Sequence, residues 1–184
     1  MSRRRRDLSW PPPPERLAQP LVDGHTHLDS VLATTDTAGW REREAPAGAE
    51  GDDGAEDGQA RSAPAPLTVE AILAEAAAVG VTRLVHIGCE LPALDWASHA
   101  VSAHAELLGG VAIHPNEAVL HAGVHEIAPD GLAPDPRPHH DVPLDEAIAR
   151  VAAVAAGNPR IRVIGETGLD FFRAGERGRA VQRE

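Results

Sequence analysis

Short apolar runs alternate with helix-type patterns along most of this chain, and this alternation constrains its fold more than any other feature. Thr68 is placed to cap a helix, apolar residues then recur at helical spacing, and Gly80 is a suitable stop. The pattern predicts a parallel α/β sheet, because parallel strands are joined by crossover helices. Strands are expected at 21–25, 81–88, 110–113 and 161–165, and helices at 68–79, 93–107 and 144–156.

Three polar segments interrupt the alternation. Residues 1–19, rich in arginine and proline, are expected to form a disordered leader. Residues 31–66 carry clustered acids among glycines and prolines, and they are predicted to be a solvated linker because their carboxylates lack the spacing of a calcium loop. Residues 123–141 are predicted to be a proline-rich loop. The sequence therefore predicts a folded region over 20–184 that carries two insertions.

Charge and cysteine content exclude several classes of protein. A formal net charge of −11 argues against a protein that coats nucleic acids or membrane surfaces. The N-terminal arginines are not followed by the apolar stretch of an export signal, so we expect a cytoplasmic protein. Cys89 is the single cysteine, which excludes an intrachain disulfide. With no histidine base evident near it, Cys89 is expected to be structural.

The sharpest local motif is His25-Thr26-His27, where the first expected strand ends. Residues two apart on a strand project from the same face, so both imidazoles can reach one cation at about 2.0–2.1 Å. The alternative is a pair of polar residues that begin a loop. The position favours a metal site, because the active sites of parallel α/β folds lie beyond the carboxyl ends of their strands.

Two further candidates follow later strands. Glu166 lies among glycines after the fourth expected strand, where a carboxylate can bridge two divalent ions about 3.5–4 Å apart. The alternative there is a glycine-rich turn with a solvent-facing glutamate. Asp170 can support such a site or cap the segment after it. His114, after the third strand, can bind a substrate phosphate or carboxylate, although the adjacent Pro115 fits a rigid loop equally well.

The other histidines give weaker signals. His86 lies within an expected strand and is predicted to be packed. His121 and His125 have the spacing of a helical metal pair, but a glycine between them weakens the helix. His139 and His140 lie in the proline-rich loop and are expected to be solvated.

The ordered set of motifs resembles a known family. GHTHLD, VTRLVHIGCE, GVAIHPNEA and VIGETGLDFF follow one another as in the TatD-type metal-dependent hydrolases of the amidohydrolase-like superfamily, from about Leu21 to Phe172 and more weakly to Glu184. The resemblance implies a TIM-barrel (β/α)8 fold, of which this chain supplies about the first half, with four strands and three helices. Several members of the family are deoxyribonucleases, so a DNA substrate is implied.

When the family's functional residues are matched to this sequence, the resemblance implies that His25 and His27 are ligands of one metal. It makes Glu166 a catalytic ligand shared with a second ion. The implied cofactors are therefore two divalent metal ions, with Mg, Mn and Zn all open as their identity.

The remaining positions of the family pattern are those that support the metal site or contact the substrate. Asp29, in the HxHLD pattern, is implied to support the first-strand site. His114 matches the histidine of the family's G-[IL]-H-P motif and is implied to contact substrate. Asn116 stands where many members have a second histidine, so that residue's role is in doubt in this chain.

These inferences favour a divalent-metal hydrolase acting on ester bonds, with DNA as the expected substrate. The family site is completed by histidines and an aspartate after later strands, so the chain is expected to be an amino-terminal portion of the enzyme. Two alternatives stay open. One is a small-molecule amidohydrolase, and the other is a non-catalytic, metal-binding remnant whose residues 1–184 have no nuclease activity.

Overall fold

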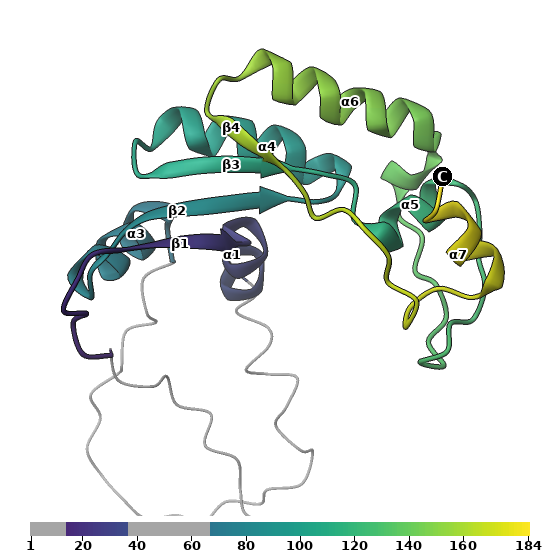
Figure 1. The fold of residues 1–184 in the computed structure, drawn as a ribbon, viewed down its shortest axis with the longest axis horizontal. Helices are drawn as coiled ribbons and strands as arrows, with labels where there is room; N and C mark the ends of the chain where they lie inside the picture. Colours follow the sequence, from purple (N-terminus) through teal and green to yellow (C-terminus); the bar gives the residue numbers. More distant parts are fainter. Residues whose placement is uncertain (1–13, 37–66) are drawn as a thin grey trace, which may run out of the picture.

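In the part of the chain that the structure describes, four parallel strands form one central sheet. The computed structural model describes residues 14–36 and 67–184 of the chain. The strand order β1-β2-β3-β4 follows the sequence, as in consecutive βα units of a TIM barrel, so the predicted α/β class is confirmed (Figure 1). The strands are β1 (Leu21–Thr26), β2 (Val81–Gly88), β3 (Leu107–Val111) and β4 (Ile161–Ile164).

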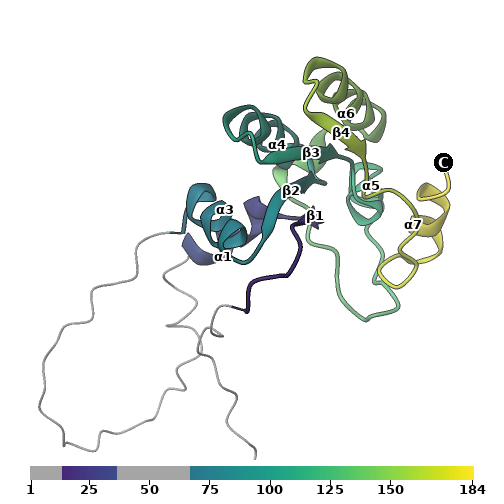
Figure 2. The same cartoon turned by 60° about the vertical axis from the view of Figure 1, so that its left-hand side comes forward.

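Helices occupy two places relative to this sheet. The helices are α1 (Leu28–Asp36), α3 (Val69–Ala78), α4 (Leu91–Ala103), α5 (Pro115–His121), the 3₁₀ turn η1 (Pro138–Asp141), α6 (Leu144–Gly157) and α7 (Glu176–Val181). Of these, α3, α4 and α6 lie along one side of the strands, whereas α5 and α7 lie beyond the strands' carboxyl ends (Figures 1 and 2). Within the described residues, no helix combines the length and the apolar character needed to cross a membrane.

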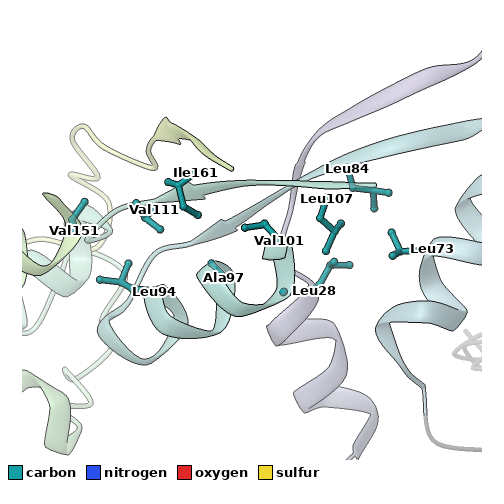
Figure 3. Close-up of a cluster of buried hydrophobic side chains, with 11 residues drawn as sticks. Leu28, Leu73, Leu84, Leu94, Ala97, Val101, Leu107, Val111, Val151 and Ile161 are labelled. Carbon is teal, nitrogen blue, oxygen red and sulfur yellow. The ribbon is translucent and has the colours of Figure 1, made fainter. Parts of the chain in front are cut away.

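The core lies between the sheet and the helices on its covered side (Figure 3). Leu94, Ala97 and Val101 recur at helical spacing on α4 and are fully buried. They face Leu107 and Val111 of β3, which are also fully buried. This packing holds α4 against the middle of the sheet. It thereby fixes the position of the strand ends, where the loops that carry the candidate site residues begin.

Local signals read from the sequence are confirmed at both ends of α3. The Thr68 hydroxyl accepts a hydrogen bond from the Ala71 N–H at 3.2 Å, and Gly80 has a φ of 98°, which favours glycine. Gly88 ends β2 for a different reason. A Cβ there would lie 2.5 Å from the Ala93 carbonyl oxygen, so only glycine allows α4 to start this close to the strand.

Two predicted boundaries were wrong by several residues. The helix expected over 93–107 begins at Leu91 and ends at Ala103, and the strand expected over 110–113 runs from Leu107 to Val111. Leu107 also fits the helical pattern of the preceding residues. It nevertheless begins β3, where its side chain is fully buried against α4. A proline in the first turn explains the early start of α4.

The predicted polar segments also need correction. The linker expected over 31–66 is helical through Asp36, because Leu28 buries its side chain and anchors α1 at the end of β1. The rest of that linker, 37–66, and the leader residues 1–13 lie outside the described residues. Leu17, within the expected leader, donates its N–H to the Val79 carbonyl at 2.9 Å.

A helix that the sequence did not indicate follows β3. The first helical residue of α5 is Pro115. Proline suits this position because the backbone N–H that it lacks would have no partner within the helix. The proline-rich loop after it ends in η1, so the segment 123–141 is not entirely irregular.

Candidate functional site

Three side chains from opposite edges of the sheet meet beyond its carboxyl ends. His25 lies on β1, His27 directly follows it, and Glu166 follows β4. The two histidine Nε2 atoms lie 3.1 Å apart, and Glu166 Oε1 lies 2.9 Å from the His25 nitrogen and 3.7 Å from the His27 nitrogen. We call His25, His27 and Glu166 the strand-edge group. Its ligand-type atoms are close enough together to hold one metal ion.

The hydrogen bonding of His27 suits a metal ligand. Its Nδ1 lies 2.9 Å from the Ile87 carbonyl oxygen, which can only accept a hydrogen bond. The ring proton therefore sits on Nδ1, and Nε2 keeps its lone pair for a cation. Two imidazole nitrogens and one carboxylate oxygen form a donor set that suits Zn²⁺ and other first-row divalent ions. The residues present thus fit the metal that the motifs implied.

His114 also lies near Glu166, but its ring carries the proton on the other nitrogen than the ring of His27. Its Nδ1 accepts a hydrogen bond from the Asn116 N–H at 3.2 Å, so the ring proton sits on Nε2. That Nε2 lies 3.6 Å from Glu166 Oε2. His114 is therefore placed to donate a hydrogen bond toward the strand-edge group rather than to coordinate a metal.

The two expected supporting acids lie in different surroundings. Asp29, in the first turn of α1, has a buried Oδ1 without a hydrogen-bond partner in the described part of the chain. Asp170 accepts hydrogen bonds from the Asn116 side chain at 2.8 Å and from the Phe172 N–H at 3.2 Å. The hydrogen bond from Asn116 is the main cause that lowers the pKa of Asp170. Asp170 thus caps the segment after it and ties that segment to α5.

A cavity of about 680 Å³ opens between the strand ends and the loops, with His27 and His114 in its wall. Cys89 also lines this cavity. Burial, reinforced by nearby carboxylates that include Glu166, raises the pKa of the Cys89 thiol to about 12. The thiol is protonated at neutral pH and so is a poor nucleophile, in agreement with the structural role expected from the sequence.

His86 is packed, as predicted, and fully buried. Its Nδ1 accepts the Leu28 N–H at 3.1 Å, and its ring lies edge-on to Trp96 with centroids 4.6 Å apart. Burial lowers the pKa of His86 to about 4, with a smaller contribution from His27 in the same direction and an opposing one from Asp29.

This shift predicts a pH dependence of stability. The unfolded chain, with an ordinary histidine pKa of 6.5, binds a proton that folded His86 does not accept until about pH 4. The free energy of unfolding should therefore fall as pH is lowered from about 6.5 to about 4. Urea unfolding at several pH values checks this, with His86→Gln as the comparison. An equal slope in the two proteins over this range would contradict it.

A second cluster corrects the expectation that His139 and His140 are solvated. His140 is only 8% exposed, and the Nε2 atoms of His139 and His140 lie 3.0 and 2.8 Å from Glu117 Oε2. His121, on the same helix as Glu117, belongs to this cluster. His125 is exposed and does not belong to it. We call Glu117, His121, His139 and His140 the loop group. No sequence pattern indicated Glu117 as a ligand, because α5 was not expected.

Comparison with known proteins agrees with these motifs. The family model described as TatD related DNase matches residues 22–184. A curated relative from Mycobacterium tuberculosis (strain ATCC 25618 / H37Rv), named "Uncharacterized metal-dependent hydrolase TatD", is 26% identical over 152 residues. The aligned region covers 83% of this chain and 38% of that relative, so the chain spans less than two fifths of the relative's length. The family match covers most of the chain, and the chain therefore belongs to the TatD-related DNase family of metal-dependent hydrolases.

Proposed function

We propose that this chain takes part in metal-dependent hydrolysis of phosphodiester bonds in DNA. The observation that carries the proposal is the strand-edge group, in which two imidazole nitrogens and a carboxylate oxygen lie within 3.7 Å of one another. In this proposal His25 and His27 hold one divalent ion, Mg, Mn or Zn, and Glu166 is the catalytic ligand shared with a second. A bound divalent cation supplies charge that polarises the scissile ester and makes water a stronger nucleophile at neutral pH.

The chain's own residues have separate tasks in this proposal. The Ile87 carbonyl holds the proton of His27 on Nδ1, so that Nε2 faces the cation. His114 directs an N–H toward the same place, where it can donate to a phosphate oxygen of the substrate. Asp170 holds Asn116 and thereby the first turn of α5, whose N-cap residue is His114. Asp29 is proposed to support the histidines from the cavity wall.

The accessibility of the group suits a polymeric substrate. The side chains of His25 and Glu166 are 50% and 32% exposed, and the cavity beside them is open to solvent. Arg137 and Arg173 line that cavity, and each is paired with a carboxylate of the same wall: Arg137 lies 3.1 Å from Asp135, and Arg173 lies 3.7 Å from Asp130. Binding of a phosphodiester is therefore expected to depend on bound metal ions rather than on these arginines or on the overall charge.

A cleavage assay tests the proposal. The full chain is incubated with end-labelled single-stranded DNA and Mg²⁺, Mn²⁺ or Zn²⁺, in parallel with cyclic amides and simple esters. We expect metal-dependent cleavage of DNA that EDTA stops and that His25→Ala or Glu166→Gln lowers by at least about 100-fold, an effect typical of lost catalytic groups. His125→Ala, which removes an exposed histidine outside both groups, should cleave like the unchanged chain.

Other results would assign the site differently. Hydrolysis of a cyclic amide but not of DNA would identify a small-molecule amidohydrolase. Metal binding without turnover of any substrate would favour a non-catalytic metal-binding protein. One observation favours that last candidate, since the strand-edge group offers three ligand residues in the described part of the chain, whereas a two-metal centre uses more.

A further inference from the structure

The loop group forms a second set of metal-type ligands, separate from the strand-edge group. Glu117 and His121 of α5 meet His139 and His140 of η1, and their four ligand-type atoms lie within 4.8 Å of one another. We propose that this cluster is a second divalent-metal site, in which Glu117, His121 and His139 coordinate the ion and His140 holds Glu117 in place. The proposal does not depend on the hydrolase function proposed above.

His121 has the clearest features of a ligand. Its Nδ1 lies 2.7 Å from the Val142 carbonyl oxygen, so the ring proton sits on Nδ1 and the lone pair on Nε2. The residue is only 5% exposed, and its Nε2 is buried with no hydrogen-bond partner in the described ranges. Leaving a buried acceptor unsatisfied is unfavourable, and a cation among these side chains would satisfy it. Burial also lowers the pKa of His121, which favours the uncharged ring that coordination needs.

His140 has the opposite arrangement and a different role. The Arg137 N–H donates to His140 Nδ1 at 2.7 Å, so the ring proton sits on Nε2 and is donated to Glu117 Oε2 at 2.8 Å. This is how residues behind a metal site orient a carboxylate ligand. His139 Nε2 lies 3.0 Å from the same oxygen and is free to coordinate when its proton is on Nδ1.

The electrostatics keep Glu117 charged. Burial favours the neutral acid, but in the metal-free cluster the hydrogen bonds from His139 and His140, together with the charges of these two histidines, outweigh burial and lower the pKa of Glu117. A charged carboxylate with two imidazole nitrogens is a donor set of the kind that binds Zn²⁺. Because the ligands come from α5 and from η1, which ends the proline-rich loop, an ion here would fasten that loop to the helix. Glu117 and His140 line the same cavity as His27, so the ion would also fix the cavity wall.

Cobalt binding tests the proposal with a spectroscopic readout that does not depend on activity. The full chain carrying His25→Ala and His27→Ala is stripped of metal and titrated with Co²⁺, whose visible absorption reports coordination by imidazole and carboxylate. We expect one bound ion per chain. Adding His121→Ala or the isosteric Glu117→Gln should lower the affinity by at least about 100-fold, since even residues behind a metal site change affinity by about 10–100-fold.

Controls separate loss of a ligand from loss of the fold. His125→Ala, which removes the exposed histidine four residues after His121, should leave the cobalt spectrum and the affinity unchanged. Zn²⁺ should raise the melting temperature of the doubly substituted chain but not that of its Glu117→Gln derivative, with circular dichroism confirming that both are folded. No bound cobalt in the doubly substituted chain, or binding that survives Glu117→Gln in folded protein, would overturn the proposal.

Discussion

Replacing both His25 and His27 by alanine is expected to remove one divalent ion from the protein and to lower the affinity of the strand-edge group by more than about 100-fold. The double change deletes two of the three ligand-type residues of the group and leaves Glu166 as the remaining one. Glu166→Gln keeps the size of the side chain but removes the charge of the third ligand, so a loss of at least about 100-fold is expected here too.

Isothermal titration with Zn²⁺ and Mn²⁺ measures this effect. The titrations are carried out in a Glu117→Gln background, so that the loop group does not contribute a second ion. The matched control is His99→Ala with His125→Ala, which also removes two histidines, both exposed and outside the two ligand groups. If the control and the His25/His27 variant retained the same number of bound ions and the same affinity, the strand-edge group would not be the metal site.

The second large effect concerns stability. Leu107→Ala is expected to lower the free energy of unfolding by about 2–5 kcal/mol, the range measured for buried leucines. Leu107 is fully buried in β3, where it pairs in register with Leu84 and packs toward Val101 of α4 (Figure 3). Truncation would leave a cavity between the central strands and the helix that covers them.

Urea unfolding followed by circular dichroism measures the loss. Leu132→Ala is the matched control, because Leu132 lies in a loop with 56% of its surface exposed, and its truncation should change stability by no more than about 0.5 kcal/mol. Similar stabilities for the two variants would contradict the packing described for the core.

The parts that could be predicted from the sequence are those with local or strictly periodic causes. Thr68 and Gly80 mark the ends of α3, Thr68 by its capping hydroxyl and Gly80 by its freedom to adopt a positive φ. Both predicted helix ends were confirmed. The convergence of His25 and Glu166 followed from topology, because the carboxyl ends of parallel strands meet at one edge of a sheet. Their contact at 2.9 Å agrees with that reasoning.

The parts that could not be predicted depend on contacts between distant segments. The polar composition of 31–66 concealed the end of α1, which is anchored by the burial of a residue before that segment, Leu28. The loop group requires His140 to return to Glu117 across 23 positions of the sequence, and no periodic pattern in the proline-rich loop indicates that return. His139 and His140 were therefore expected in solvent, although they pack against α5.

The most direct test of the central claim is diffraction from crystals grown with Zn²⁺, measured at the zinc absorption edge. We predict an anomalous peak about 2.0–2.2 Å from Nε2 of His25, Nε2 of His27 and a carboxylate oxygen of Glu166. A peak at the loop group would be separate and would not bear on this claim. Well-ordered crystals with no anomalous peak among His25, His27 and Glu166 would contradict the assignment of the metal centre.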